Sequence, residues 1–208
     1  MGGGTDSRIP AVLNESLNSR FPEKKIEVVV RTYDFDPEKA HSQIGEWVEE
    51  LTPSLIIGES LGAIQAIRVK GIPHILISPS LNAPVYFRTL AFVSLIPGVT
   101  WLLSKIYKTR TENRQLMPFK YPILKKYGRH RKAALALSPK AGGKDYFYAF
   151  FGDFDHYRKT GIVSLTSYVK YFKSNSQPKF YETYPGTHFM EEEFIHSRLI
   201  PKIIKILE

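Results

Sequence analysis

The stretch LIIGESLGAIQAI, residues 55–67, decides how the rest of the chain is interpreted. It begins with apolar residues typical of a buried strand and ends in an Ala- and Ile-rich pattern typical of a helix. Between them, Gly58 and Gly62 stand two positions before and two positions after Ser60. A strained turn that exposes a serine between a strand and a helix leaves no room for larger side chains there. The stretch therefore predicts a turn that presents Ser60 as a nucleophile; the alternative is an ordinary polar step between two elements.

Length and composition limit the classes of protein to which this serine could belong. The chain has 208 residues, of which 43% are hydrophobic, and this indicates one domain with an insertion. It contains no cysteine, which excludes a thiol nucleophile, thiolate-bound zinc and disulfides, and favours a reducing compartment. The start, MGGGTDSRIP, lacks the basic and apolar regions of a signal peptide. We therefore expect a cytoplasmic protein.

The positive charge of the chain is concentrated in one segment. The whole chain has a formal charge of +9, whereas residues 105–140 alone hold eleven basic residues and one acid, a charge of +10. Such a segment could bind nucleic acid or an anionic membrane surface, attract an anionic substrate, or be a solvated face. Because the remainder is nearly neutral and resembles an ordinary α/β protein, we expect no nucleic-acid partner.

Alternating patterns of strands and helices predict the fold class. Amphipathic patterns at 37–51, 60–70, 160–172 and 191–207 predict helices. Five short β-branched or aromatic runs predict strands, at 26–31, 54–58, 74–78, 145–152 and 179–184. Strand–helix alternation favours right-handed crossovers. We therefore expect an α/β protein with a mostly parallel central sheet and helices on both faces.

One long segment interrupts this alternation. It contains VYFRTLAFVSLIPGVTWLLSKIYK, residues 85–108, which is apolar but broken by Arg88, Pro97 and Gly98. The part between Arg88 and Lys105 is too short to span a membrane comfortably. We expect two short helices hinged at Pro97-Gly98, followed by the basic segment. Together, residues 81–139 would form a helical cap inserted into a core made of residues 1–80 and 140–208. The alternative is that these residues belong to the core.

A serine nucleophile needs a general base, which is commonly a histidine oriented by a carboxylate. Two aspartates, Asp153 and Asp155, follow the predicted strand at 145–152, and His188 lies in a loop after the last predicted strand. An ordinary surface-loop histidine is the alternative for His188. His196 falls within an amphipathic helical pattern, for which we expect a structural role.

In their order and positions, these motifs resemble those of the α/β-hydrolase family, and the resemblance covers nearly the whole chain. It rests on GESLG at 58–62, the G-x-x-D pattern at 152–155 and the G-x-H pattern at 186–188. It implies that Ser60 attacks an acyl carbon and that His188 transfers its proton. Asp155 would orient the imidazole, with Asp153 as the reserve acid. No metal or organic cofactor would be required.

The resemblance also implies an oxyanion hole formed by two backbone N–H groups. Leu61 would supply one of them, and Gly4, in GGGTDSR, would supply the other. In the family a central strand leads into this N-terminal loop, whereas here only Met1 precedes the glycines. Either the sequence as given starts late, or the sheet closes without that strand.

The resemblance and the expected cap together imply a serine hydrolase that acts on a carboxylic ester. Apolar residues of the cap, such as Tyr86, Phe87, Phe92, Trp101 and Leu102, favour an apolar acyl or aryl group. The basic residues suggest an anionic substrate or contact with a membrane surface. A thioesterase or an acyltransferase would share the same residues. A non-catalytic scaffold that binds anionic partners through the cap is the other alternative.

Overall fold

A four-stranded parallel sheet forms the centre of the molecule. The computed structural model describes residues 9–106, 117–136, 146–173 and 179–208. The sheet has the order β1-β2-β3-β4, and all three neighbouring pairs are parallel. The strands are β1 (Ile56–Glu59), β2 (His74–Ile77), β3 (Phe147–Gly152) and β4 (Tyr181–Tyr184). The predicted α/β class with a mostly parallel sheet is confirmed.

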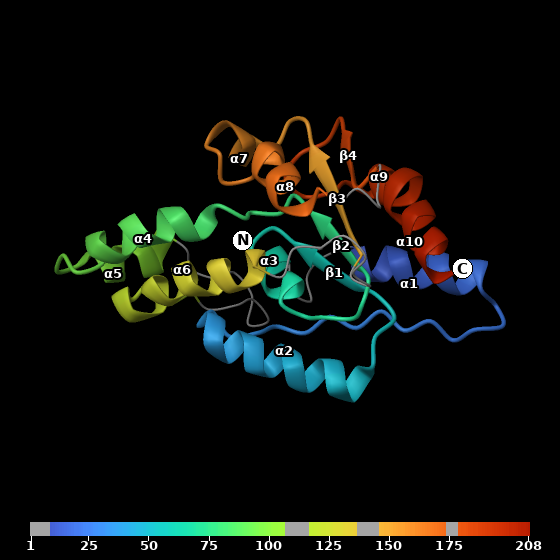
Figure 1. Ribbon diagram of the computed structural model, residues 1–208, viewed down its shortest axis with the longest axis horizontal. Coiled ribbons are helices and arrows are strands. Elements are labelled where there is room, and N and C mark those ends of the chain that lie inside the picture. Colours follow the sequence, from blue (N-terminus) through green and yellow to red (C-terminus); the bar gives the residue numbers. More distant parts are fainter. Residues whose placement is uncertain (1–8, 107–116, 137–145, 174–178) are drawn as a thin grey trace.

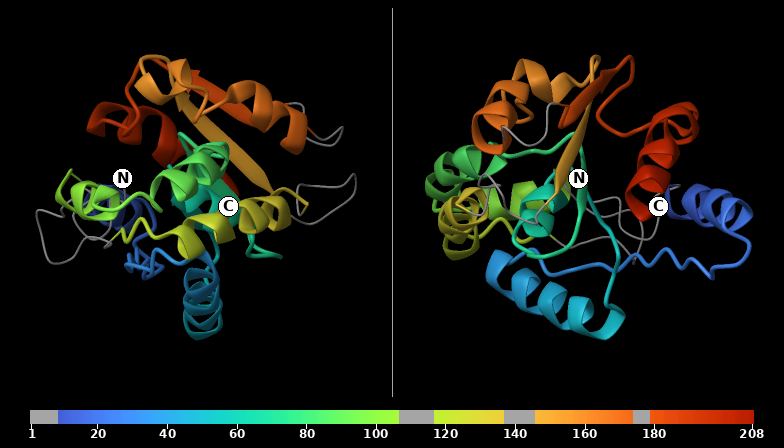
Figure 2. Two further views of the ribbon diagram at one scale, coloured as in Figure 1. Left: turned by 90° about the vertical axis from the view of Figure 1, so that its left-hand side faces the viewer. Right: turned by 45° about the vertical axis from the view of Figure 1, so that its right-hand side comes forward.

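Helices cover both faces of the sheet (Figures 1 and 2). One face carries α1 (Ile9–Arg20) and the C-terminal helix α10 (Ile200–Leu207). The other carries α3 (Gly62–Ile67), α4 (Ala83–Val93), α6 (Tyr121–Leu135) and α8 (Leu165–Phe172). The remaining elements are α2 (Pro37–Leu51), α5 (Val99–Ile106), α7 (His156–Lys159), α9 (Glu192–Phe194) and the π-helical turn η2 (Ile195–Leu199).

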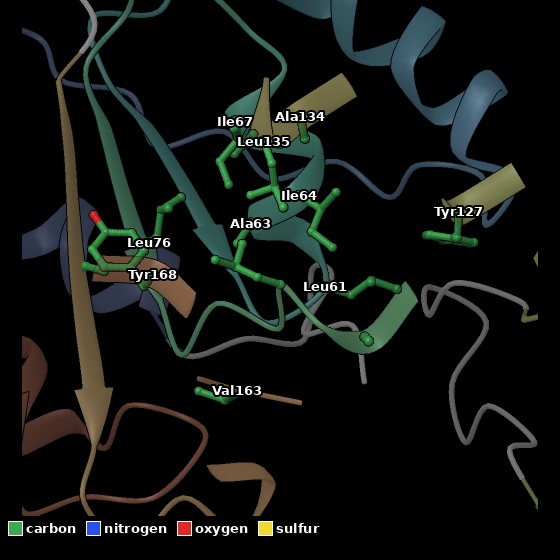
Figure 3. Close-up of a cluster of buried hydrophobic side chains, with 14 of the residues drawn as sticks. Leu61, Ala63, Ile64, Ile67, Leu76, Tyr127, Ala134, Leu135, Val163 and Tyr168 are labelled. Atoms are coloured by element: carbon green, nitrogen blue, oxygen red, sulfur yellow. The ribbon is translucent and has the colours of Figure 1, made fainter. Parts of the chain in front are cut away.

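Alternating side chains of the central strands supply both hydrophobic layers. In β2, Ile75 and Ile77 pack in the layer that contains α1 and α10, whereas Leu76 packs in the layer that contains α3. This alternation is a consequence of the two-residue repeat of a strand. Figure 3 shows residues of the second layer, in which Ala63 and Ile64 of α3 lie near Leu76 and the side chains of α6. The short helix α3 is therefore held between the sheet and α6.

Four helical patterns predicted from the sequence correspond to helices in the structure, with differences at their ends. α2 has the predicted bounds because Asp36 accepts a hydrogen bond from the N–H of Glu38 at 3.0 Å and Pro37 opens the helix. The helix expected at 60–70 is shorter, and the one expected at 160–172 begins after the capping residue Ser164. The pattern at 191–207 is one helical stretch in which η2 separates α9 from α10.

The strand predicted at 26–31 is wrong. These residues are not assigned to any strand. Both the N–H and the C=O of Ile26 bond to the side chain of Asn18, at 3.1 and 2.9 Å. Ile26 and Val28 pack against the layer that contains α1. The run of β-branched residues in this stretch therefore belongs to an extended segment that packs against the core without sheet pairing.

The segment between β2 and β3 contains the two predicted short helices. α4 ends at Val93 and α5 begins at Val99, and Gly98 between them has φ of +84°. Phe87 of α4 and Tyr127 of α6 are buried in the same cluster as α3, whereas none of the eight residues of α5 is buried. The segment thus combines two helices that pack on the core with one that projects from it (Figure 1).

A buried histidine lies where α2, α3 and α6 meet. Arg68 donates a hydrogen bond to Nδ1 of His130 at 2.8 Å, so His130 accepts through this nitrogen and is neutral. Burial, the Arg68 charge and nearby His41 lower the pKa of His130 to about 3. The unfolded chain therefore binds a proton at this residue at a higher pH than the folded protein does.

We expect acid to destabilise the fold through His130. Below the ordinary histidine pKa of about 6.5, the free energy of unfolding should fall by up to about 1.4 kcal/mol per pH unit from this residue. Urea unfolding between pH 7 and 5 measures this slope. His130→Asn, which keeps an acceptor for Arg68 but cannot titrate, should flatten it, whereas exposed His196→Gln should not. An unchanged slope in His130→Asn would contradict the assignment.

Candidate active site

The polar residues of the site lie in the loops that follow the four strands, at the carboxyl ends of these strands. Ser60 comes directly after β1, Ser78 and Ser80 follow β2, Asp155 follows β3 and His188 follows β4. Because the strands are parallel, their carboxyl ends lie together, and this is where open α/β sheets bind ligands. All five residues are buried. The sheet topology therefore brings together side chains that are as many as 128 residues apart.

Ser60 has the strained backbone that the GESLG motif predicts. Its φ is +52°, a left-handed conformation that is uncommon for a residue other than glycine. Its N–H donates to the carbonyl of Ile77 at 2.9 Å, which ties the turn to β2. A Cβ at Gly58 would lie 2.8 Å from Cβ of Ala66, so α3 can pack against β1 only if this position has no side chain. At Gly62 the constraint is milder, since a Cβ would approach the Tyr33 hydroxyl at 3.3 Å.

His188 lies between Ser60 and Asp155. Its Nδ1 is 2.8 Å from Oδ2 of Asp155, and its Nε2 is 2.8 Å from Oγ of Ser60. A carboxylate can only accept, so Nδ1 carries the proton and Nε2 accepts the hydroxyl proton of Ser60. A serine oxygen, an imidazole and a carboxylate thus form one continuous hydrogen-bonded chain.

Two glycines allow the loops after β3 and β4 to touch. A Cβ at Gly152 would collide with the carbonyl of Thr187, the residue before His188. The N–H of Phe154 donates to the carbonyl of Gly186 at 2.9 Å across the same contact. The glycines of the G-x-x-D and G-x-H patterns therefore bring Asp155 and His188 within hydrogen-bonding distance.

The two aspartates of this loop have different partners. Asp155 caps α7 by accepting from the N–H of Tyr157 at 2.8 Å, and its other oxygen binds His188. Burial alone raises the pKa of Asp155, but the hydrogen bonds from His188 and Tyr157 outweigh it and lower this pKa below the ordinary value. Asp153 instead pairs with Arg158 at 3.0 Å. The structure brings Asp155 to the histidine and turns Asp153 away from it.

Glu59 is a third carboxyl group near His188. Burial raises its pKa above the ordinary value, and the electrostatic influence of the His188 imidazole offsets only part of this effect. It has no hydrogen bond to His188 within the described ranges. Glu59 therefore favours its neutral form more than an ordinary glutamate, whereas Asp155 favours the carboxylate.

Sequence reasoning missed Ser80, which contacts the nucleophile candidate directly. Its Oγ lies 3.2 Å from Oγ of Ser60, and its N–H donates to the Ser60 carbonyl at 3.0 Å. Since the Ser60 proton points to His188, the Ser80 hydroxyl donates to the Ser60 oxygen. Ser78, also buried, has φ of +43°. The only signal in the sequence was the segment Ser78-Pro79-Ser80, which begins at the last residue of the strand predicted at 74–78.

A cavity of about 370 Å³ opens beside Ser60. Ser60, Leu61 and Ser80 line it at one end. Most of its remaining lining is apolar and comes largely from α4, and includes Ala83, Phe87, Leu90 and Val93, together with Phe119 and Ile162. The space next to the serine hydroxyl is therefore suited to an apolar group.

The expected oxyanion donors lie partly outside the described residues. Leu61 is the N-cap residue of α3, at the end of a helix where backbone N–H groups lack intrahelical acceptors. Gly4 lies outside the described ranges. Across the described ranges, no cluster of three or more histidine, aspartate or glutamate side chains is arranged to hold a metal ion. No helix in those ranges is both long and apolar enough to cross a membrane.

Comparison with known proteins supports the fold. No family model matches the chain, and no curated protein matches it in sequence. The chain is similar in structure to a monoacylglycerol lipase of Paleococcus ferrophilus, with a TM-score of 0.52 and 16% sequence identity, over 82% of this chain and 76% of that one. The chain has the α/β-hydrolase fold. The described sheet has β1 as one of its two edge strands, and residues 26–31 are not part of it.

The close contact between Gly58 and α3 can be tested by measuring the free energy of unfolding. Gly58→Ala should lower the free energy of unfolding by about 1–3 kcal/mol, because the added methyl group would overlap with Ala63 and Ala66. Gly45→Ala is the matched control, since nothing lies within 4 Å of a Cβ there and alanine favours the helix by about 1 kcal/mol. Urea denaturation measures both. Equal effects of the two substitutions would show that α3 does not pack tightly on β1.

Proposed function

We propose that the protein is a serine hydrolase that cleaves a carboxylic ester with an apolar acyl or aryl group. The observation that carries the proposal is the hydrogen-bonded chain from Ser60 through His188 to Asp155, with both distances at 2.8 Å. These residues have the geometry that acyl transfer requires, namely a nucleophile bonded to a base and a base bonded to an orienting carboxylate.

The proposed reaction has two steps. Ser60 Oγ attacks the acyl carbon while Nε2 of His188 takes its proton, and the protonated imidazole then gives this proton to the departing alkoxide. A water molecule, deprotonated by His188, attacks the acyl-enzyme and releases the acid, and the proton returns to Ser60. Asp155 holds the imidazole in the required tautomer and stabilises its charged form. The Leu61 N–H is the proposed donor to the developing oxyanion, with Gly4 as the proposed second donor.

Two observations support an apolar acyl or aryl group. The cavity beside Ser60 is lined mainly by apolar side chains of α4, and its volume of about 370 Å³ is in the usual range for small-molecule sites. The similar solved structure is named as a monoacylglycerol lipase, which acts on a lipid ester. We propose that residues 81–139 act as a cap; described residues of this range supply most of the cavity lining. The same machinery would serve a thioesterase or an acyltransferase, which differ in the substrate or in the group that accepts the acyl chain.

Ser60→Ala should abolish both covalent labelling by a fluorophosphonate probe and turnover of a short-chain ester. Loss of a triad nucleophile commonly costs several orders of magnitude in rate. The measurements are mass spectrometry of the labelled peptide and initial rates, with circular dichroism as the control for folding. Labelling that remains on another serine would contradict the proposal.

The aspartates should differ in their effect on turnover. Asp155→Asn should lower kcat by about 10⁴, because an amide in this position favours the wrong tautomer of His188. Asp153→Asn is the matched control and should lose only its ion pair with Arg158, with little change in kcat. Ester hydrolysis rates compare the two variants. A larger effect at Asp153 would transfer the orienting role to that residue.

A further inference from the structure

Exposed apolar side chains are concentrated at one end of the described structure. Nine of the thirteen large hydrophobic residues exposed in the described ranges lie between residues 85 and 106. The most exposed of the nine are each at 57–63% of their full surface; they are Phe92 in α4, Leu95 and Ile96 in the turn, and Trp101 and Ile106 in α5. Figure 1 shows that α5 and the adjoining end of α4 project from the molecule. We call Phe92, Leu95, Ile96, Trp101, Leu102 and Ile106 the apolar tip.

The helix α5 has an unusual composition for its exposure. Five of its eight residues are Val, Trp, Leu or Ile, yet none is buried, and only Leu103 among them packs against the core cluster. A helix this short is marginal in water without tertiary packing. Large exposed apolar patches mark interaction sites on soluble domains. The tip therefore lacks the contacts that its side chains favour, and a partner could supply them.

Basic side chains lie beside the apolar tip. Lys105 lies over the ring of Trp101 at 4.2 Å, and Lys125 lies over Tyr121, whose ring packs edge-on against Phe92. Four cations near the tip have no acidic partner among the described residues; they are Arg88, Lys105, Lys120 and Lys125. The described residues of 81–106 and 117–136 include no acid at all.

The cavity beside Ser60 opens next to the same surface. Tyr86 and Val93 of α4 both line the cavity and are exposed, at 47% and 39%. Phe92 of the apolar tip is the neighbour of Val93 on this helix and faces solvent. An apolar chain bound near the tip would therefore reach the serine along the mainly apolar side of α4 that lines the cavity.

We propose that the apolar tip and its four cations dock on a lipid surface that carries anionic head groups. Apolar side chains would enter the interface, and the cations would contact the head groups, as in interfacial amphipathic helices. A second copy of the chain is disfavoured as the occupant, because self-association through this face would bring the same cations together without an acid between them. The further statement that an acyl ester reaches Ser60 from this surface rests on the proposed function.

Vesicle binding tests the docking surface directly. Sucrose-loaded vesicles of phosphatidylcholine, with and without phosphatidylserine, are sedimented with the protein. We expect binding to the anionic vesicles that weakens with salt. Replacing Arg88, Lys105, Lys120 and Lys125 by Gln should lower the affinity by about two to three orders of magnitude, given the usual contribution of a basic residue near an anionic membrane. Replacing Trp101, Leu102 and Ile106 by Ser should also weaken binding strongly.

Matched control variants distinguish the effect of this surface on vesicle binding from the effects of net charge and of exposed apolar area in general. Gln at Lys25, Lys70, Lys173 and Lys205 changes the net charge equally at exposed positions elsewhere, and Val29→Ser removes an exposed apolar side chain. These variants should bind vesicles like the unmodified protein. Trp47→Phe leaves Trp101 as the single tryptophan, whose emission should shift to shorter wavelength and be quenched by brominated lipids.

Four results would overturn the proposal. They are absence of binding to anionic vesicles, equal losses in the tip and control variants, a dimer that the tip substitutions dissociate, and binding to a nucleic acid in place of vesicles. The tip variants should retain hydrolysis of a water-soluble short-chain ester, because their residues do not line the cavity. Vesicle binding by Ser60→Ala is measured separately, so failure of the proposed chemistry and failure of the docking surface are distinguishable.

Discussion

The left-handed turn at Ser60 is the constraint on which the rest of the site depends. In this turn the Ser60 N–H donates to the carbonyl of Ile77, and the Ser60 carbonyl accepts from the Ser80 N–H. Ser60 therefore joins the end of β1 to the end of β2. The turn is tolerated because Gly58 lets α3 approach β1 at a distance that a side chain would prevent. The helix then fixes the direction of the serine hydroxyl and of the Leu61 amide. Strain in the backbone is thus balanced by packing and hydrogen bonds immediately around it.

The acid and base are held by a second contact of the same kind, between the loops that follow β3 and β4. Gly152 permits the carbonyl of Thr187 to approach, and the hydrogen bond between Phe154 and Gly186 fixes the two loops in register. Asp155 then uses one oxygen for the N-terminus of α7 and the other for His188. Because both oxygens are engaged, the carboxylate cannot rotate away from the imidazole without uncapping a helix. The capping of α7 by Asp155 therefore also helps to orient His188.

Parts of the site that depend on local sterics could be predicted from the sequence. GESLG predicts the turn, since a side chain at Gly58 would overlap with α3, and Asp36 and Pro37 predict the start of α2. Contacts between residues that are distant in the sequence are harder to predict from it. Ser80 contacts Ser60 only because β1 and β2 are neighbours in the sheet. The segment 26–31 shows the reverse error. Its β-branched residues form an extended segment with one partly buried side, a feature that an unpaired segment shares with a strand.

Helix α4 explains why the apolar stretch at 85–108 was difficult to interpret from sequence alone. Its residues face three environments: Phe87 and Ala91 are buried against the core, Leu90 and Val93 line the cavity, and Phe92 is exposed. All three environments select apolar side chains, so the sequence shows one hydrophobic run without a clear periodicity. In the structure, side chains of α4 that face different environments point in different directions from the helix. The apolar residues of α4 continue from the core to the cavity and on to the surface, so the approach to the serine is mainly apolar. On the described surface, the exposed apolar residues are concentrated at the outer end of that approach.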